Sequence, residues 1–137
     1  MKKQLFFIVL IIIVLPLVGC TKNVNLISDF VKLDRAYIPT LFLTNLEKFN
    51  PSKKAIAKLK EEWDVFKGKY YEYNNEDPQW SKDFDKVDQS IREADKIISS
   101  GGDLIEAHEA LETIRYTFLK TRRRNNIDYY IEHYRFS

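Results

Sequence analysis

Cysteine, methionine, glycine and proline are all scarce in this 137-residue chain. The one cysteine is Cys20, and a single thiol excludes an intrachain disulfide, a multi-cysteine zinc or iron–sulfur site and haem attachment through a CxxCH pair. The one methionine is Met1. After Cys20, glycine occurs only at positions 68, 101 and 102, and proline only at 39, 51 and 78. Because these residues interrupt regular structure, their rarity predicts long helices.

The chain also lacks a strong net charge and the sequence signatures of enzymes. Residues 1–19 contain two of the 22 lysines and arginines and none of the 20 acids, which leaves 20 basic and 20 acidic residues in the remainder. This balance favours neither nucleic acid nor an acidic ligand. No glycine-rich phosphate loop, nucleophile elbow or HExxH sequence occurs. We therefore predict a protein that is not an enzyme and does not bind nucleic acid.

The N-terminus is typical of a targeting segment. Lys2 and Lys3 precede an apolar run of about thirteen residues, from Leu5 to Leu17. This length fits the core of a signal peptide and falls short of the ~20 residues that a spanning helix needs. The run ends in the sequence LVGC at residues 17–20, which resembles the lipobox of bacterial lipoproteins.

The lipobox resemblance implies that residues 1–19 are removed, that lipid is attached to Cys20 and that residues 20–24 form a short tether. Two or three acyl chains would make such an anchor effectively permanent. Thr21, and not Asp, follows the cysteine, which by resemblance to Gram-negative lipoproteins implies an outer-membrane protein facing the periplasm. The alternative is a plain signal peptide followed by a free cysteine.

Apolar residues at helical spacing predict four helices, and no window alternates long enough for a strand. The first helix is expected over residues 25–49, with a kink at Pro39. The second follows Asn50-Pro51-Ser52, where Asn50 or Ser52 can cap it, and the third ends at Ser100–Gly102. Asp103 is expected to cap the fourth, and residues 127–136 either continue it or form a packed tail. The positions expected to face inward are Ile27, Phe30, Tyr37, Leu41 and Leu46; Ile56, Leu59, Trp63, Phe66, Tyr70 and Tyr73; Trp80, Phe84, Val87, Ile91, Ala94 and Ile98; and Leu104, Leu111, Ile114 and Phe118.

Four helices joined by short links pack most simply as an all-α, up-down-up-down bundle over residues 25–137. The layout, with Trp80 and Phe84 opening the third helix and a basic run closing the fourth, resembles the cytochrome b562 and cytochrome c′ type of bundle. Those proteins hold haem with a methionine and a histidine or with CxxCH, and this chain has no methionine after Met1 and no CxxCH. His133 is the one histidine near the place of a C-terminal haem ligand. The resemblance therefore implies the fold without the usual haem site.

Two charged residues fall on faces that should be apolar. Asp34 continues the inward row of the first helix, and Arg115 continues that of the fourth. In an antiparallel pairing the two lie at similar heights, so we expect a partly buried Asp34–Arg115 ion pair. Such a pair fixes helix register, or alternatively belongs to a polar pocket that holds a ligand.

His108 also lies on the inward row of the fourth helix. With Glu112 it forms an i, i+4 pair, and Asp95, near the end of the third helix, is a further possible ligand for a metal. The Glu-x-x-His motif of di-iron bundles is absent, because Ile105 stands three residues before His108. The alternatives are a core-edge histidine bonded to a tyrosine or carboxylate, and a position that changes protonation with pH.

Aromatic residues gather where the second helix ends, the third begins and the C-terminal segment returns. Tyr70, Tyr73, Trp80 and Tyr130 are therefore candidates for a ligand-binding end, or they simply close the bundle. The basic run from Lys120 to Arg124 either complements the helix dipole or contacts anionic lipid.

These patterns predict a non-enzymatic envelope lipoprotein, anchored in a membrane by lipid, whose helical bundle binds a protein partner or a small ligand. No resident cofactor is expected. The alternative is a periplasmic bundle that handles metal or haem through His108 and nearby carboxylates, or through His133.

Overall fold

The computed structural model describes the backbone of residues 19–129 and the side chains of residues 25–129. This part of the chain forms four helices and no strand: α1 (Gly19–Asn45), α2 (Phe49–Tyr70), α3 (Trp80–Ser100) and α4 (Leu104–Arg124). The predicted all-α four-helix bundle is therefore confirmed. None of the described helices combines the length and the apolar character that crossing a bilayer would demand.

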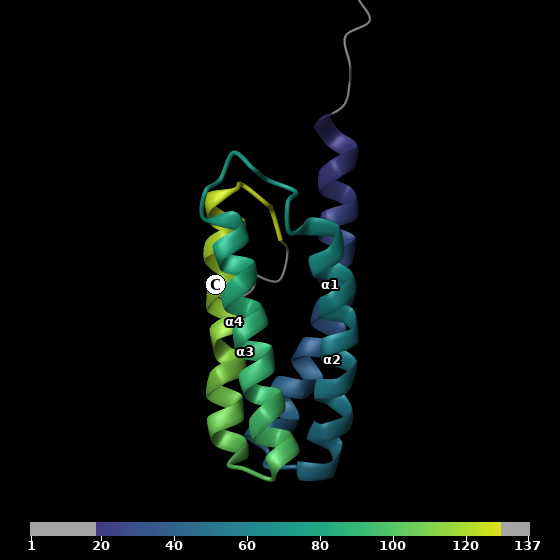
Figure 1. Cartoon of the computed structure of the whole chain (residues 1–137). Coiled ribbons are helices and arrows are strands. Elements are labelled where there is room, and N and C mark those ends of the chain that lie inside the picture. Colours follow the sequence, from purple (N-terminus) through teal and green to yellow (C-terminus); the bar gives the residue numbers. More distant parts are fainter. Residues whose placement is uncertain (1–18, 130–137) are drawn as a thin grey trace, which may run out of the picture.

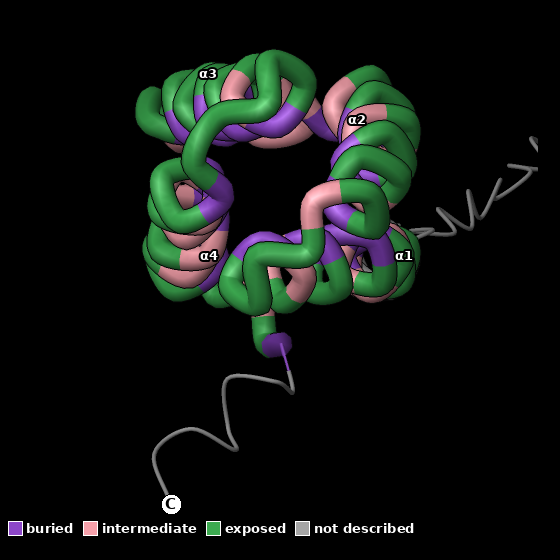
Figure 2. Tube along the Cα trace, turned by 90° about the horizontal axis from the view of Figure 1, so that it is seen from below, coloured by how far each residue is buried: buried purple, intermediate pink, exposed green. Residues whose placement is uncertain are grey.

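The helices run alternately up and down (Figure 1). The α1–α2 and α3–α4 connections lie at one end of the bundle, and the α2–α3 connection lies at the other end with the start of α1 and the end of α4. Seen end-on, the four helices form a ring in which buried positions face the centre (Figure 2). Packing is more extensive within the α1–α2 and α3–α4 pairs than between them. The bundle is thus two helical hairpins packed side by side.

The predicted apolar rows of α3 and α4 are buried in full, and in α2 only Tyr73 departs. It lies half-buried in the connection after α2, because the helix ends at Tyr70. Rings from all four helices meet in the core, where Phe66 and Phe84 stack with their centroids 5.8 Å apart. Phe30 and Phe118 approach edge-on at 5.2 Å. Burial of such large rings supplies much of the free energy that stabilises a bundle of this size.

The N-terminal hairpin differs from the sequence prediction in three ways. α1 begins at Gly19 and not near residue 25, so the backbone of residues 20–24 is helical. α1 ends at Asn45, and Glu47 takes a left-handed φ of 52° that reverses the chain. Leu46, predicted to face inward, is therefore 45% exposed. α2 then starts at Phe49 with Lys48 as its cap residue, and neither Asn50 nor Ser52 caps it.

The other helix ends follow the sequence signals. Gly101 closes α3 in the left-handed conformation, with φ 75°, and its backbone N–H donates to Ile98. The Asp103 carboxylate caps α4 by accepting from the Ile105 backbone N–H at 2.8 Å. α4 stops at Arg124, and Asn126 turns the chain with φ 51°. As far as Tyr129, the segment after α4 is thus a packed tail and not a continuation of the helix.

Candidate functional site

The predicted aromatic end is closed by its own rings. The Tyr70 and Tyr73 centroids lie 5.5 Å apart, and those of Tyr73 and Trp80 lie 5.8 Å apart. The Trp80 indole N–H donates to the Tyr70 carbonyl at 2.7 Å, which fixes the α2–α3 connection. Burial and a 2.8 Å hydrogen bond to Asp29 raise the pKa of Tyr70 above its usual range. Three of the four predicted residues come together here, and Tyr130 lies outside the described residues.

The predicted Asp34–Arg115 pair is not formed. Arg115 donates through Nε to Glu112 at 2.7 Å, and Asp34 accepts a hydrogen bond from the Tyr129 hydroxyl. Glu112 lies one turn before Arg115 on α4, so the guanidinium reaches this acid without crossing to α1. The buried Tyr37 hydroxyl, which lies near both charges, donates to the Leu111 carbonyl at 2.9 Å. Burial raises the pKa of Tyr37 beyond its usual range, which keeps the phenol neutral as a donor.

The three predicted metal ligands are not brought together. The Nδ1 atom of His108 lies 3.0 Å from the Leu41 carbonyl, and its Nε2 atom lies 4.0 Å from Glu112. Asp95 of α3 is instead held by α2, where the Lys60 ammonium donates to it at 2.5 Å. Within residues 25–129, no group of three or more histidines and acids is arranged to hold a metal ion. His133 lies outside the described residues.

The basic run at the end of α4 is used inside the molecule. The Arg122 side chain is buried, and its guanidinium lies over the rings of Tyr129 and Phe30, at 4.5 and 5.2 Å from their centroids. Arg124 instead turns toward α3 and the α2–α3 connection. The side chains of Arg122 and Arg124 therefore pack on different sides of α4.

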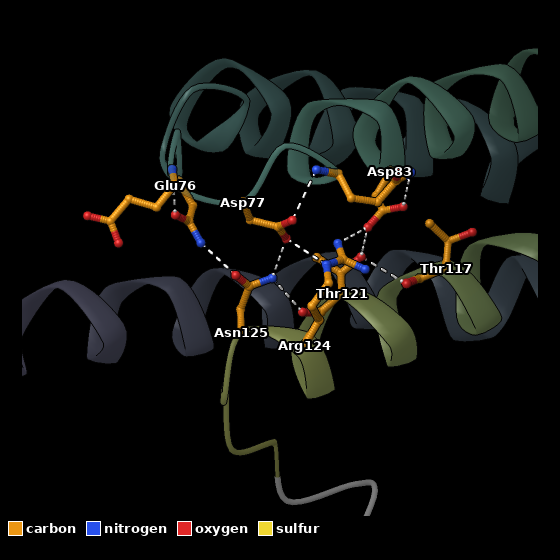
Figure 3. Close-up of polar contacts among 9 residues, drawn as sticks. Glu76, Asp77, Asp83, Thr117, Thr121, Arg124 and Asn125 are labelled. Carbon is orange, nitrogen blue, oxygen red and sulfur yellow. Dashed lines mark hydrogen bonds and ion pairs between the residues drawn. The ribbon is translucent and has the colours of Figure 1, made fainter.

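Arg124 is the centre of a polar cluster that sequence reasoning missed (Figure 3). Its Nε donates to Asp77 at 2.7 Å, and its Nη2 pairs with Asp83. Asp83 also accepts from the Thr121 hydroxyl at 2.7 Å, and Asp77 accepts from the Asn125 amide at 2.8 Å. Burial alone would raise the pKa of Asp77, but the hydrogen bonds from Asn125 and Arg124 outweigh it and lower that pKa. The cluster fastens the α2–α3 connection to the end of α4.

Beside this cluster, a groove runs over the surface between α3 and α4. Asp83 and Arg124 of the cluster line it, Lys86 and Lys120 add positive charge, and Tyr116, which also lines it, is 54% exposed. The groove is lined by Gln79, Asp83, Lys86, Thr113, Tyr116, Thr117, Lys120 and Arg124. The Arg115 guanidinium stacks on the Tyr116 ring at 4.4 Å and holds the ring in place. Charges of both signs beside an exposed aromatic ring form a surface suited to a polar protein segment.

One residue of this groove, Asp83, could have been identified from the sequence. Asp83 stands three residues after Trp80 and four before Val87, so the helical spacing places this acid on the inward side of α3. In the structure Asp83 is 7% exposed, and a carboxylate is rarely buried unless it is paired. Its partners come from α4, 38 and 41 residues along the chain. Only the tertiary arrangement of α3 and α4 identifies them.

Comparison with known proteins gives no relative. No protein-family model, no curated protein and no solved structure matches the chain.

Proposed function

We propose that this chain is a lipid-anchored lipoprotein of the bacterial cell envelope, with no enzymatic activity, whose helical bundle binds a protein partner. The observation that carries the proposal is the LVGC sequence at residues 17–20, directly after an apolar run of signal-peptide length. In a Gram-negative host the protein would lie on the outer membrane and face the periplasm. Transfer of diacylglycerol to the Cys20 thiol would supply the anchor.

The position of Cys20 supports an upright orientation on the membrane. Cys20 falls in the first turn of α1, which continues without a break into the bundle. The lipid would therefore be attached at the end of the molecule that also carries the α2–α3 connection and the end of α4 (Figure 1). A helix of 27 residues is about 40 Å long, so the opposite end would stand about that far from the lipid.

The geometry favours a protein partner over a small enclosed ligand. Tyr70, Tyr73 and Trp80 contact one another at the aromatic end, and of these three rings only Tyr73 borders a surface hollow, which is otherwise lined by residues from the end of α2 and the connection after it. The groove between α3 and α4 lies on the surface, is lined by charged and hydroxyl-bearing side chains and is bordered by the exposed Tyr116 ring. We assign partner binding to this groove.

The anchor is tested by labelling cells with a palmitate analogue and by measuring the mass of the mature N-terminus. The expected result is label on the wild-type chain, an N-terminus at Cys20 and recovery in the membrane fraction. Cys20→Ser should carry no label and accumulate uncleaved. An unlabelled wild-type chain, cleaved at another position, would show a plain signal peptide and contradict the proposal.

Partner binding is tested by a photo-crosslinking amino acid placed at Tyr116 in intact cells. The expected result is one defined adduct with an envelope protein, weakened when Lys120→Glu reverses a charge of the groove. The matched control carries the probe at Glu93, which is exposed on α3 outside the groove. Equal crosslinking at both positions, or none at Tyr116, would exclude the groove as the binding surface.

A further inference from the structure

An apolar strip lies open along the second half of α1 and the turn that follows it. Ile38, Phe42 and Leu46 are one turn apart and are 51%, 59% and 45% exposed. The eleven residues from Ala36 to Leu46 contain no charge, so nothing on this stretch of α1 keeps the strip hydrated. Single exposed large apolar side chains are common on protein surfaces. Three in one row form a contiguous apolar surface, and such a surface is stabilised when another segment or protein buries it.

The same row of α1 is already covered nearer its start. Phe30 and Asp34 precede Ile38 at the same four-residue spacing. Tyr129 packs on both of them: its ring centroid lies 5.9 Å from that of Phe30, and its hydroxyl donates to Asp34. Tyr129 is 2% exposed, so the chain is firmly held at this point.

The direction of the chain leads from the covered part of the row toward the open part. After α4, the Ile127 backbone N–H donates to the Arg122 carbonyl at 2.9 Å. From there the chain descends along the bundle to Tyr129, in the direction in which α1 also runs (Figure 1). The next members of the row in that direction are Ile38, Phe42 and Leu46.

The remaining chain has the length and the composition to cover the strip. Eight residues follow Tyr129, and an extended chain of eight residues spans at most about 26 Å. Leu46 stands twelve positions after Asp34, a rise of only about 18 Å at helical spacing. Four of the eight residues are aromatic or aliphatic, namely Tyr130, Ile131, Tyr134 and Phe136.

The size of the strip favours this segment over a second copy of the chain. Three side chains of about 200 Å² each, half exposed, offer roughly 300 Å², whereas a stable interface buries about 800 Å² per partner. A segment of the same chain needs far less surface, because Tyr129 already holds it nearby and its effective concentration is high. We propose that the strip formed by Ile38, Phe42 and Leu46 is the docking site of the C-terminal segment, residues 130–137.

This inference goes beyond the proposed function and does not depend on it, since strip and segment belong to one chain whether or not Cys20 carries lipid. It is tested in the full chain, in cells, with a benzophenone amino acid at Phe42. After irradiation, peptide mass spectrometry should find crosslinks within one chain to residues 130–137. The probe at Ile38, one turn earlier, is an independent repeat should substitution of Phe42 disturb the fold. The control is the probe at Val65, which is 56% exposed on α2 and should give no such product.

Each other outcome overturns the proposal. A crosslinked dimer would make a second copy the occupant, and an adduct with a different protein would make the strip a partner site. Yields at Phe42 and Ile38 no higher than at Val65 would show a strip open to water. In a chain that stops after Tyr129, the crosslink to the C-terminal segment must vanish while Val65 is unaffected.

Discussion

Replacing Asp83 by alanine should destabilise the bundle, because this buried acid joins α3 to the end of α4. The Asp83 side chain is 10% exposed and accepts hydrogen bonds from Thr121 and Arg124, with a longer one from Gln79 at 3.3 Å. Hydrogen bonds to charged groups contribute about 1.5–3 kcal/mol. Arg124 is 35% exposed and keeps Asp77, and Thr121 keeps the Thr117 carbonyl, so neither donor is stranded. We expect a loss of about 2–3 kcal/mol.

Thermal unfolding followed by far-UV circular dichroism measures this loss. At about 4 °C per kcal/mol for a domain of this size, Asp83→Ala should lower Tm by about 8–12 °C. Asp83→Asn retains an acceptor for Thr121 but loses the charge opposite Arg124. Its Tm should lie about midway between those of wild type and Asp83→Ala. Glu93→Ala, which removes an exposed acid from the same helix, should change Tm by only about 2 °C.

The order of the Tm values of the three variants tests this prediction. Asp83→Ala no less stable than Glu93→Ala would mean that the cluster contributes nothing, and the account of how α3 is fastened to α4 would fail. If Asp83→Asn lowers Tm as much as Asp83→Ala, the whole loss of stability comes from the missing negative charge opposite Arg124. The Thr121 hydrogen bond then contributes none of it.

Three further predictions concern sites outside the groove. Ser52 is buried, and its hydroxyl has no hydrogen-bond partner among the described residues, so Ser52→Ala should raise the free energy of unfolding by about 1 kcal/mol in a urea titration; a loss of stability would reveal a partner. Although burial raises the pKa of Asp29, hydrogen bonds from Lys32, Lys69 and Tyr70 lower it to about 2, from an ordinary value of 3.8. A lowered pKa stabilises the fold above the unfolded value, so about 1–2 kcal/mol should be lost as pH falls from 4 to 2, and Asp29→Asn should remove that pH dependence; an unchanged profile would contradict the assignment. Added zinc should shift the Tm of wild type and of His108→Ala alike, because Asp95 is held by Lys60 on another side of the bundle; a rise seen in wild type alone would place a metal at His108.

The fold was predictable from the sequence because the spacing of apolar residues along each helix indicates which positions are buried. The inward rows of α3 and α4 were found residue by residue, and the glycine after Ser100 marked the end of α3. The end of α1 was misplaced, because the apolar character of Leu46 and Phe49 continues past the reversal at Glu47. No spacing rule shows that a helix stops when the residues on both sides of the stop are apolar.

The polar contacts were much less predictable, for a reason that Arg115 illustrates. A long charged side chain reaches several acids, and Glu112 on its own helix proved nearer than Asp34. The pairing of Asp83 with Arg124 depends on the relative height of two helices, and a shift of one turn would change it. The height follows from the packing of the whole core, which a pattern of single residues does not contain.

The two tryptophans of this molecule provide two intrinsic fluorescence probes at different places in the bundle. Trp63 and Trp80 are its only tryptophans, and both are buried. Trp63 donates to Asp88 at 2.9 Å and so emits from the interface of α2 and α3, whereas Trp80 donates to the Tyr70 carbonyl and emits from the closed end. Single tryptophan-to-phenylalanine variants would separate the two signals. Loosening of the closed end alone would then alter the emission of one ring and leave the other unchanged.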